Sequence, residues 1–429
     1  MCLSAPTRWS STEQWALLLA IAGTVLVTFL PCLSNGFISW DDSVYLLDNP
    51  QINRRDGLKS IWRDVFRHEE SEFQVPGRGE RVARQYYPLV FSSYWLEFRL
   101  QEAVRGADSS LSVRENVQNK TLVPGLFHLV SVALHALNAF LVFQCLRMLG
   151  TSKFVTWVAT LLFALHPMQV ASVAWVAERK NTLSLAFYLV ALLLYVKVRR
   201  DGGWWRYGLS ILAFEAALLS KTAVATLPLV LFTVDRLLDR SWDRKGIQRS
   251  IARVLPFVVL SLIASFIAGV AESRDRAIDL NLSERPLVAA RALLFYPIKM
   301  LMPVSQSPVY PLWQPDTGQL LWYVPPFVLA LACYLVIRHR RRLDPRFIWA
   351  LSFYAVTQLP MVGFIDINYF QFSFVADHYF YHGAIGLCLA AALVLQGCLQ
   401  TMANPRWTPQ NRPLIDTSKP AIRPAAESG

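Results

Sequence analysis

The sequence predicts an all-α polytopic membrane protein, and three observations carry that prediction. Apolar residues make up 54% of the 429-residue chain. Charged residues make up only 17%, whereas about 25% is typical of soluble globular chains. The apolar residues come in blocks of about 20, the length that crosses a hydrocarbon core about 30 Å thick. A soluble enzyme, a disordered chain and a secreted disulfide scaffold are therefore excluded.

The apolar blocks give the order of the membrane helices along the chain. A segment surrounded by lipid must satisfy its own backbone hydrogen bonds, so most blocks are expected to be helical. The blocks fall at 14–34, 124–148, 154–176, 181–198, 205–219, 221–238, 249–271, 287–303, 320–337, 346–365 and 379–399. Their order shows no internal repeat, which disfavours a transporter built from two related halves.

Basic residues orient these helices. The formal net charge is +12, and positive charge in a membrane protein concentrates in cytoplasmic connections. The basic connections lie at 197–206, 236–253 and 338–346, so all three are expected to be cytoplasmic. This requires one block between the second and third connections not to cross, and 287–303, with Arg291 and Lys299, is the weakest. The sequence thus predicts about ten spans, eleven if that block also crosses, with both termini cytoplasmic.

The remaining segments complete the predicted organisation of a GT-C-like membrane domain over residues 1–400. The connection 35–123 is expected on the outer, periplasmic side, with amphipathic helices around 58–66 and 88–100 that lie on the membrane surface or cap the bundle. Its charges nearly balance, which argues against a nucleic-acid partner. Residues 273–319 form a second outer connection, which carries the interfacial or re-entrant helix 287–303. The Pro-rich residues 401–429 are expected to be a disordered cytoplasmic tail.

The sharpest polar feature is the pair Asp41 and Asp42, a few residues beyond the first span. Adjacent carboxylates beside a bilayer repel each other, so one of them should have a raised pKa or hold a cation. Such a pair suits a general base that deprotonates a hydroxyl, or a metal-assisted site. The alternative is a solvated turn, because the nearby Asp48-Asn49-Pro50 is typical turn sequence.

A second polar cluster follows the third span, where His166 precedes a proline and Arg179 and Lys180 are adjacent. Polar residues at membrane depth are costly and are more often functional than not. The predicted topology places this cluster on the same outer face as Asp41. The alternatives are a hydrogen-bonded helix kink at His166 and snorkelling side chains at Arg179 and Lys180.

Two further clusters are expected at that face. Lys221 separates two short apolar blocks and suits a phosphate or pyrophosphate as a point charge, although a snorkelled helix end explains it equally well. Asp377 and Tyr379 open the last span, and Tyr379 alone fits an ordinary interfacial aromatic belt. No nucleotide-binding loop is present, so the activated group would have to arrive on a lipid.

Several strings follow one another in a specific order. They are WDD at 40–42, YYPLV at 86–90, FHLVSVALHALNA at 127–139, FALHPMQVASVAWVAERKNTLS at 163–184, LLSKTAVATLPLVL at 218–231, the stretch 296–311, and ADHYFYHGAIG at 376–386. Together they resemble the membrane portion of the transmembrane and TPR repeat-containing O-mannosyltransferase family. That family belongs to the GT-C superfamily of polyprenyl-phosphate-sugar glycosyltransferases.

The resemblance implies an inverting hexosyl transfer of the mannosyl type. The expected location is a bacterial inner membrane, with the site facing the periplasm. A carboxylate deprotonates the acceptor hydroxyl, which attacks the anomeric carbon while polyprenyl phosphate leaves. The partners would be a polyprenyl-phosphate-linked sugar, a protein or glycan acceptor, and membrane lipids. The implied roles are the base for Asp41 or Asp42, phosphate contacts for Arg179, Lys180 and Lys221, and substrate contacts for His166, Asp377 and Tyr379.

The chain departs from the family pattern in ways that keep a second hypothesis open. Ala171 stands where the family usually has Glu, Asn181 where it has Asp, and His378 where it has Arg. Because two carboxyls are lost, the requirement for a divalent cation is an open question. The same loss favours the alternative hypothesis of a catalytically degenerate scaffold or lipid-glycan-binding protein. The segment after the last span also lacks TPR repeats, so a glycan or lipid acceptor, or recognition by a partner, is expected.

Overall fold

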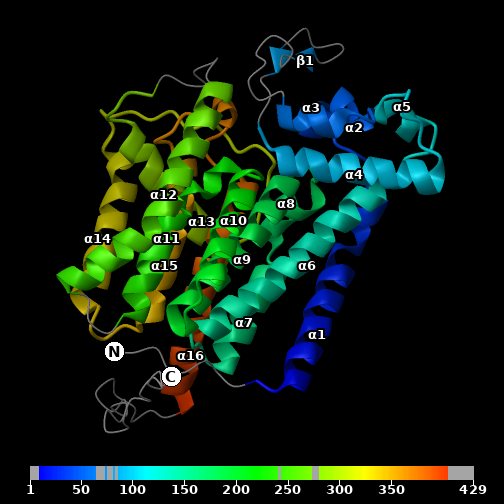
Figure 1. Ribbon diagram of the computed structural model, residues 1–429. Helices are drawn as coiled ribbons and strands as arrows, with labels where there is room; N and C mark the ends of the chain where they lie inside the picture. The colour runs from blue at the N-terminus through cyan, green and yellow to red at the C-terminus, as the bar shows by residue number, and fades with distance from the viewer. Residues whose placement is uncertain are drawn as a thin grey trace.

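Helices form nearly all of the regular structure in the computed structural model, which describes residues 9–63, 73–74, 81–82, 86–239, 243–272 and 280–403. The helices are α1 (Ser11–Phe29), α2 (Pro50–Asn53), α3 (Gly57–Arg63), α4 (Pro88–Arg105), α5 (Val113–Gln118), α6 (Pro124–Met148), α7 (Lys153–Leu165), α8 (Val170–Ala174), α9 (Arg179–Asp201), α10 (Trp204–Leu218), α11 (Leu227–Leu238), α12 (Arg244–Glu272), α13 (Arg285–Leu301), α14 (Val324–His339), α15 (Pro345–Gln358) and α16 (Phe380–Ala403). The strands β1 (Phe73–Gln74) and β2 (Arg81–Val82) form one short antiparallel ladder. The predicted all-α membrane fold is confirmed (Figure 1).

Six helical segments within the described residues are long and apolar enough to cross a membrane. They are Ser11–Ser34, Pro124–Met148, Val176–Asp201, Arg244–Val270, Leu320–His339 and Asp377–Ala403. The segments Lys153–Leu165 and Pro167–Ala174, bent by 50° at their junction, make a seventh if they count as one span. The helices α10, α11 and α15 have only 15, 12 and 14 residues. The count of about ten spans therefore stays a prediction.

The basic connections meet at one end of the bundle, which we call the basic end. Asp235 of α11 accepts hydrogen bonds from Arg199 of α9, at 2.5 Å, and from Arg253 of α12, at 2.8 Å. Arg346 at the start of α15 donates to the carbonyl of Gly150, next to the end of α6. The three segments that the charge pattern assigns to one side thus lie together.

The first and last helices also begin and end near each other, at the basic end. Lys153 of α7 pairs with Glu13 of α1 at 2.6 Å. Its neighbour Ser152 donates to Gln396 of α16 at 2.8 Å. Both contacts place the start of α1 and the end of α16 beside the same turn, as the prediction of both termini on one side requires.

The opposite end, which we call the site end, is capped by the short helices of the first long connection. Figure 1 shows α4 lying across the ends of the long helices, with α2, α3 and α5 gathered above it. Proline suits the first turn of α4, and Gly106, with φ 74°, ends it in the left-handed conformation. Tyr94 and Phe98 are fully buried on its inner face. Helix α4 corresponds to the amphipathic helix predicted around 88–100. The one predicted around 58–66 corresponds to α3, and its residues 64–66 lie outside the described residues.

Helix α13, the block predicted not to cross, contacts one connection with both of its ends. Arg285, at its start, donates to the carbonyl of Gly363 at 3.1 Å. Tyr296, near its other end, donates to the carbonyl of Ala376 at 3.3 Å. Both acceptors belong to the connection between α15 and α16, at the site end. The interfacial or re-entrant placement of this block stays a prediction.

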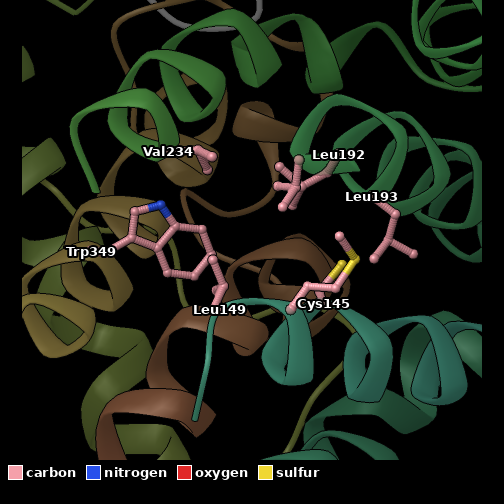
Figure 2. Close-up of a pocket in the computed structure, with 8 residues that line it drawn as sticks. Cys145, Leu149, Leu192, Leu193, Val234 and Trp349 are labelled. Carbon is pink, nitrogen blue, oxygen red and sulfur yellow. The ribbon is translucent and has the colours of Figure 1, made fainter. Parts of the chain in front are cut away.

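The apolar core fills the middle of the bundle, and one small cavity interrupts it near the basic end. Figure 2 shows its lining, which includes Cys145, Leu149, Leu192, Leu193, Val234 and Trp349. These residues come from α6, α9, α11 and α15 and from the residue that follows α6. Because the walls are almost entirely apolar, this cavity is a packing gap rather than a place for charged groups.

Candidate active site

Four segments that are far apart in the sequence meet at the site end. The Lys180 ammonium lies 3.9 Å from an Asp41 carboxylate oxygen. The backbone N–H of Ala177 donates to Asp42 at 2.7 Å. Lys221 donates to the Asn181 side-chain oxygen, and the amide nitrogen of Asn181 donates to the carbonyl of His378 at 3.2 Å. The structure thus brings together most of the polar clusters that the sequence predicts to converge.

The two aspartates have different environments. Asp42 is 1% exposed, and its two oxygens accept from the backbone N–H groups of Ile38, at 2.9 Å, and Ala177. Asp42 therefore ties the start of the first long connection to the segment before α9. The Asp41 side chain is 31% exposed and has no backbone N–H among the bonds found in the described residues. Asp41 is the carboxylate that an incoming hydroxyl can reach.

Burial raises the pKa of both aspartates. The largest influence on each is loss of solvation, which disfavours the charged form. For Asp42 the result is a pKa of about 6, although two backbone N–H groups act against the increase. For Asp41 the Lys180 ammonium opposes the increase and the Glu178 carboxylate adds to it. A carboxylate with a raised pKa is a stronger base when ionised.

Glu178 lies at the centre of the cluster, and the sequence analysis did not single it out. Its carboxylate is 1% exposed and contacts the Lys180 ammonium at 2.9 Å. It also accepts from the Asn181 amide at 2.7 Å and lies 3.9 Å from the His378 ring. Glu178 directly precedes α9, where the helix dipole favours a negative charge. An acidic residue at a helix start, followed at once by Arg179 and Lys180, was the signal available in the sequence.

The two lysines form a cationic pair around this carboxylate. Lys180 and Lys221 are only 8% and 6% exposed. The Lys180 ammonium lies 5.1 Å from the Tyr45 ring, and the Lys221 ammonium lies 6.0 Å from the Tyr379 ring. Lys221 occupies the extended break between α10 and the 3₁₀ turn η6 (Thr222–Thr226), so its side chain is fixed by backbone geometry. Buried ammonium groups held in place are suited to contact a phosphate.

A small cavity adjoins Lys221. Its lining combines polar and apolar side chains, from Tyr188, Lys221, Ala223, Val224, Thr226, Thr357, Met361, Tyr379 and His382. The Tyr188 hydroxyl is fully buried and has no hydrogen-bond partner among the described residues. A cavity with a few convergent polar groups is the usual form of a small-ligand site.

Arg179 contacts a different set of groups from its neighbour Lys180. Its guanidinium is fully buried and donates to Glu97 through two nitrogens. It also donates to Ser93 at 3.0 Å, Ser131 at 3.4 Å and the carbonyl of Phe127 at 2.7 Å. These five bonds match the five N–H groups of an arginine. The predicted phosphate contact therefore finds no donor to spare here, and Arg179 instead joins α9 to α4 and α6.

His166 and Asp377 hold the walls of the site. The His166 side chain accepts from the N–H of Met168, as the cap of the turn after α7, and contacts the carbonyl of Met300 at 2.9 Å. This is the hydrogen-bonded kink that the sequence offered as the alternative. Asp377 accepts from the Tyr310 hydroxyl at 2.8 Å. The contacts of both residues connect the site to α13 and to the segment that follows it.

The described residues do not include the ligand set of a cation site. Among the described residues, no group of three or more His, Cys, Asp or Glu side chains comes together in a way that would hold a metal ion. Both oxygens of Asp42 already accept backbone N–H groups. Whether the protein uses a divalent cation stays open, and the described residues offer no set of ligands for one.

Comparisons with known proteins agree with the motifs. The chain is 26% identical over 204 residues to the human "Protein O-mannosyl-transferase TMTC3". The aligned segment covers 47% of this chain and 19% of the relative. It is 28% identical over 187 residues to "Protein O-mannosyl-transferase F38B6.6" of Caenorhabditis elegans, covering 42% and 23%. It is 37% identical over 216 residues to "Protein O-mannosyl-transferase Tmtc1" of Drosophila melanogaster, covering 50% and 22%.

These matches confirm the resemblance predicted from the sequence. The aligned segments span about a fifth of the length of each of these relatives, at 19%, 23% and 22%. No family model matches the chain.

Proposed function

We propose, from its similarity to proteins named protein O-mannosyl-transferases, that this chain is a membrane glycosyltransferase. It transfers a hexose from a polyprenyl-phosphate donor to an acceptor hydroxyl at the outer face of the membrane. The observation that carries the proposal is the partly exposed Asp41 carboxylate, which lies 3.9 Å from the Lys180 ammonium in a buried charged cluster. The relatives' names support the sugar class and the protein acceptor.

The proposed step uses the groups of the cluster in sequence. Asp41 accepts the proton of the acceptor hydroxyl, and the hydroxyl oxygen attacks the anomeric carbon. The bond from that carbon to the phosphate oxygen breaks, and polyprenyl phosphate leaves with the electron pair. Because the hydroxyl oxygen attacks from the side opposite the phosphate, the configuration at the anomeric carbon inverts. Lys180 and Lys221 face the negative charge that develops on the phosphate. Glu178 and Asn181 hold the two ammonium groups in position.

The cavity beside Lys221 is the proposed place for the reacting end of the donor. Its unpartnered Tyr188 hydroxyl offers a hydrogen bond to a sugar hydroxyl or a phosphate oxygen. Tyr379 also lines this cavity, and its ring lies 6.0 Å from the Lys221 ammonium. Lys180 and Lys221 are thus proposed to contact the phosphate, and Asp377 and Tyr379 the substrate. Arg179 and His166 are proposed to position the surrounding segments.

A donor assay tests this function. Membrane vesicles that contain the full chain are supplied with labelled polyprenyl-phosphate mannose, polyprenyl-phosphate glucose or GDP-mannose, and with a peptide or glycan acceptor. We expect transfer from a polyprenyl-phosphate hexose, with stoichiometric release of polyprenyl phosphate. Vesicles that transfer only from the nucleotide sugar, or from none of the donors, would refute the proposal.

The same assay separates the degenerate-scaffold alternative. If the missing carboxyls disable the chain, Ala171→Glu combined with Asn181→Asp creates activity that the natural chain lacks. The structure gives a reason to expect otherwise, because the Asn181 amide donates to Glu178 at 2.7 Å while its oxygen accepts from Lys221. A carboxylate at 181 would keep the lysine contact and lose the donor to Glu178. We therefore expect no gain from the double variant.

The pH dependence follows from the raised pKa of the base. Asp41 must be ionised to accept a proton, so kcat/KM is expected to rise with pH and then level off. An ordinary aspartate is ionised above about pH 4. Here burial raises the pKa of Asp41, so the acidic limb of the profile lies at a higher pH than for an ordinary aspartate. A profile measured in vesicles that stays flat from about pH 4 to neutrality would contradict the assignment.

A further inference from the structure

Arg291 of α13 is an exposed cation at the site end, and aromatic rings rather than carboxylates surround it. Its guanidinium carbon lies 4.6 Å from the Trp313 ring and 4.7 Å from the Trp322 ring. Within the described residues, no hydrogen bond or ion pair engages its N–H groups. The other cations of α13 have acceptors: Arg285 pairs with Asp366 at 3.0 Å, and Lys299 donates to the carbonyl of Val304 at 2.7 Å.

This environment prepares a guanidinium for a planar acceptor. A guanidinium that packs on aromatic rings is held by its faces, which leaves the in-plane N–H groups available for bidentate bonds. Phosphate oxygens match that fork in spacing and charge. Trp322 is only 8% exposed, so it is fixed by the fold. The arrangement is therefore preformed to bind a phosphate, and no carboxylate among the described residues occupies that position.

The surroundings of Arg291 indicate where the phosphate comes from. Leu301, Val304, Leu320 and Leu321 are all more than half exposed, at 80%, 60%, 85% and 76%. They lie at the end of α13, just after it, and in the turn η7 (Leu320–Tyr323), which leads into α14. No side chain of α14 is buried. In a membrane protein such surfaces are suited to contact acyl chains, and Trp322 of the same turn η7 contacts Arg291.

We propose that Arg291, Trp313 and Trp322 bind the phosphate of an anionic glycerophospholipid, whose acyl chains lie along α14. This site differs in its residues from the Asp41 cluster and does not depend on the transfer reaction. A row of ring contacts joins the two, because Trp313 lies 6.4 Å from Phe295 and Phe295 lies 4.9 Å from Tyr310. Tyr310 donates to Asp377 of the active site. A bound lipid therefore steadies the segment that carries Tyr310.

Lipid retention by the purified full chain tests the proposal. Native mass spectrometry in detergent, with equal amounts of phosphatidylglycerol and phosphatidylcholine added, is compared between wild type, Arg291→Gln and Arg291→Lys. We expect wild type to retain phosphatidylglycerol selectively and Arg291→Gln to bind it roughly tenfold more weakly, as expected for loss of a charge-assisted hydrogen bond. Arg291→Lys should fall between them, because it keeps the charge and loses the fork.

Two controls distinguish this site from general attraction to anionic lipid. Lys299→Gln removes a charge from the same helix, and we expect selective retention to survive. Phosphatidylglycerol should also raise the melting temperature of wild type and not that of Arg291→Gln, because a ligand stabilises the state that binds it. Equal retention by Arg291→Gln and wild type would overturn the proposal. Equal stabilisation by inorganic phosphate without lipid would overturn it too, since the site would then serve a free anion.

Discussion

Replacing Asp41 with Asn is expected to lower the rate of sugar transfer by about 10²–10⁴-fold, the usual contribution of a general base. The change is nearly isosteric and removes the proton acceptor. Among the described residues the Asp41 side chain accepts no backbone N–H, so the fold should tolerate the substitution. Donor binding should change little, since the lysines remain. The measurement is kcat and KM for the polyprenyl-phosphate sugar in vesicles, with the melting temperature of the purified variant.

Two other aspartates provide controls for this substitution. Asp56→Asn removes an exposed carboxylate of the same connection, 63% accessible and paired with Arg54, and should leave transfer unchanged. Asp42→Asn should mainly lower the melting temperature, because an amide cannot accept both the Ile38 and Ala177 N–H groups that Asp42 binds. If Asp41→Asn kept full turnover while a stably folded Asp42→Asn lost it, the base would be Asp42.

Replacing Glu97 with Gln is expected to destabilise the fold by about 3–5 kcal/mol, the usual cost of removing one partner of a buried ion pair. The Glu97 side chain is 11% exposed, and it is the carboxylate that Arg179 contacts through two nitrogens. The Arg179 guanidinium is fully buried, with its carbon 4.6 Å from the Tyr94 ring, so it cannot reach water instead. The loss should appear as a lower melting temperature and poor yield in detergent.

A double variant distinguishes the lost pair from a local packing effect. Glu97→Gln combined with Arg179→Met removes both charges and should recover much of the stability, because replacing a whole buried pair with apolar groups is often neutral. The exposed pair of Arg54 and Asp56 gives the matched comparison, and Asp56→Asn should cost about 1 kcal/mol or less. A Glu97→Gln variant as stable as Asp56→Asn would show that the Arg179 pair does not anchor α4.

The convergence of distant segments was predictable because charge and hydropathy alone place helix ends on one face or the other. Asp41, Lys180, Lys221 and Asp377 follow from that rule. Which of two adjacent residues faces the site does not. Consecutive helical residues point about 100° apart, so Arg179 and Lys180, adjacent in sequence, contact Glu97 and Glu178 respectively. Choosing between them requires the position of α4, which the apolar pattern does not give.

The other gaps have similar physical reasons. A single carboxylate among basic residues is typical of a helix start, so the sequence does not distinguish Glu178. Its burial depends on the distant turn η10 (Asp377–Tyr379), whose His378 ring lies 3.9 Å away. The sequence does not show which of Asp41 and Asp42 is the base. Only in the folded chain do the backbone N–H groups of Ile38 and Ala177 bind Asp42 and leave Asp41 accessible. The motifs therefore identified the neighbourhood of the site, and tertiary contacts assigned the individual tasks.

The Asn181 side chain has one more consequence for how the site responds to acidity. It connects the Lys221 ammonium on one side with the Glu178 carboxylate on the other. A carboxamide neither gains nor loses a proton in water at ordinary pH, so this link acts as an electrically inert spacer. Acidification of the surrounding medium can then quench the base at Asp41 while the distance between Lys221 and Glu178 stays as it is.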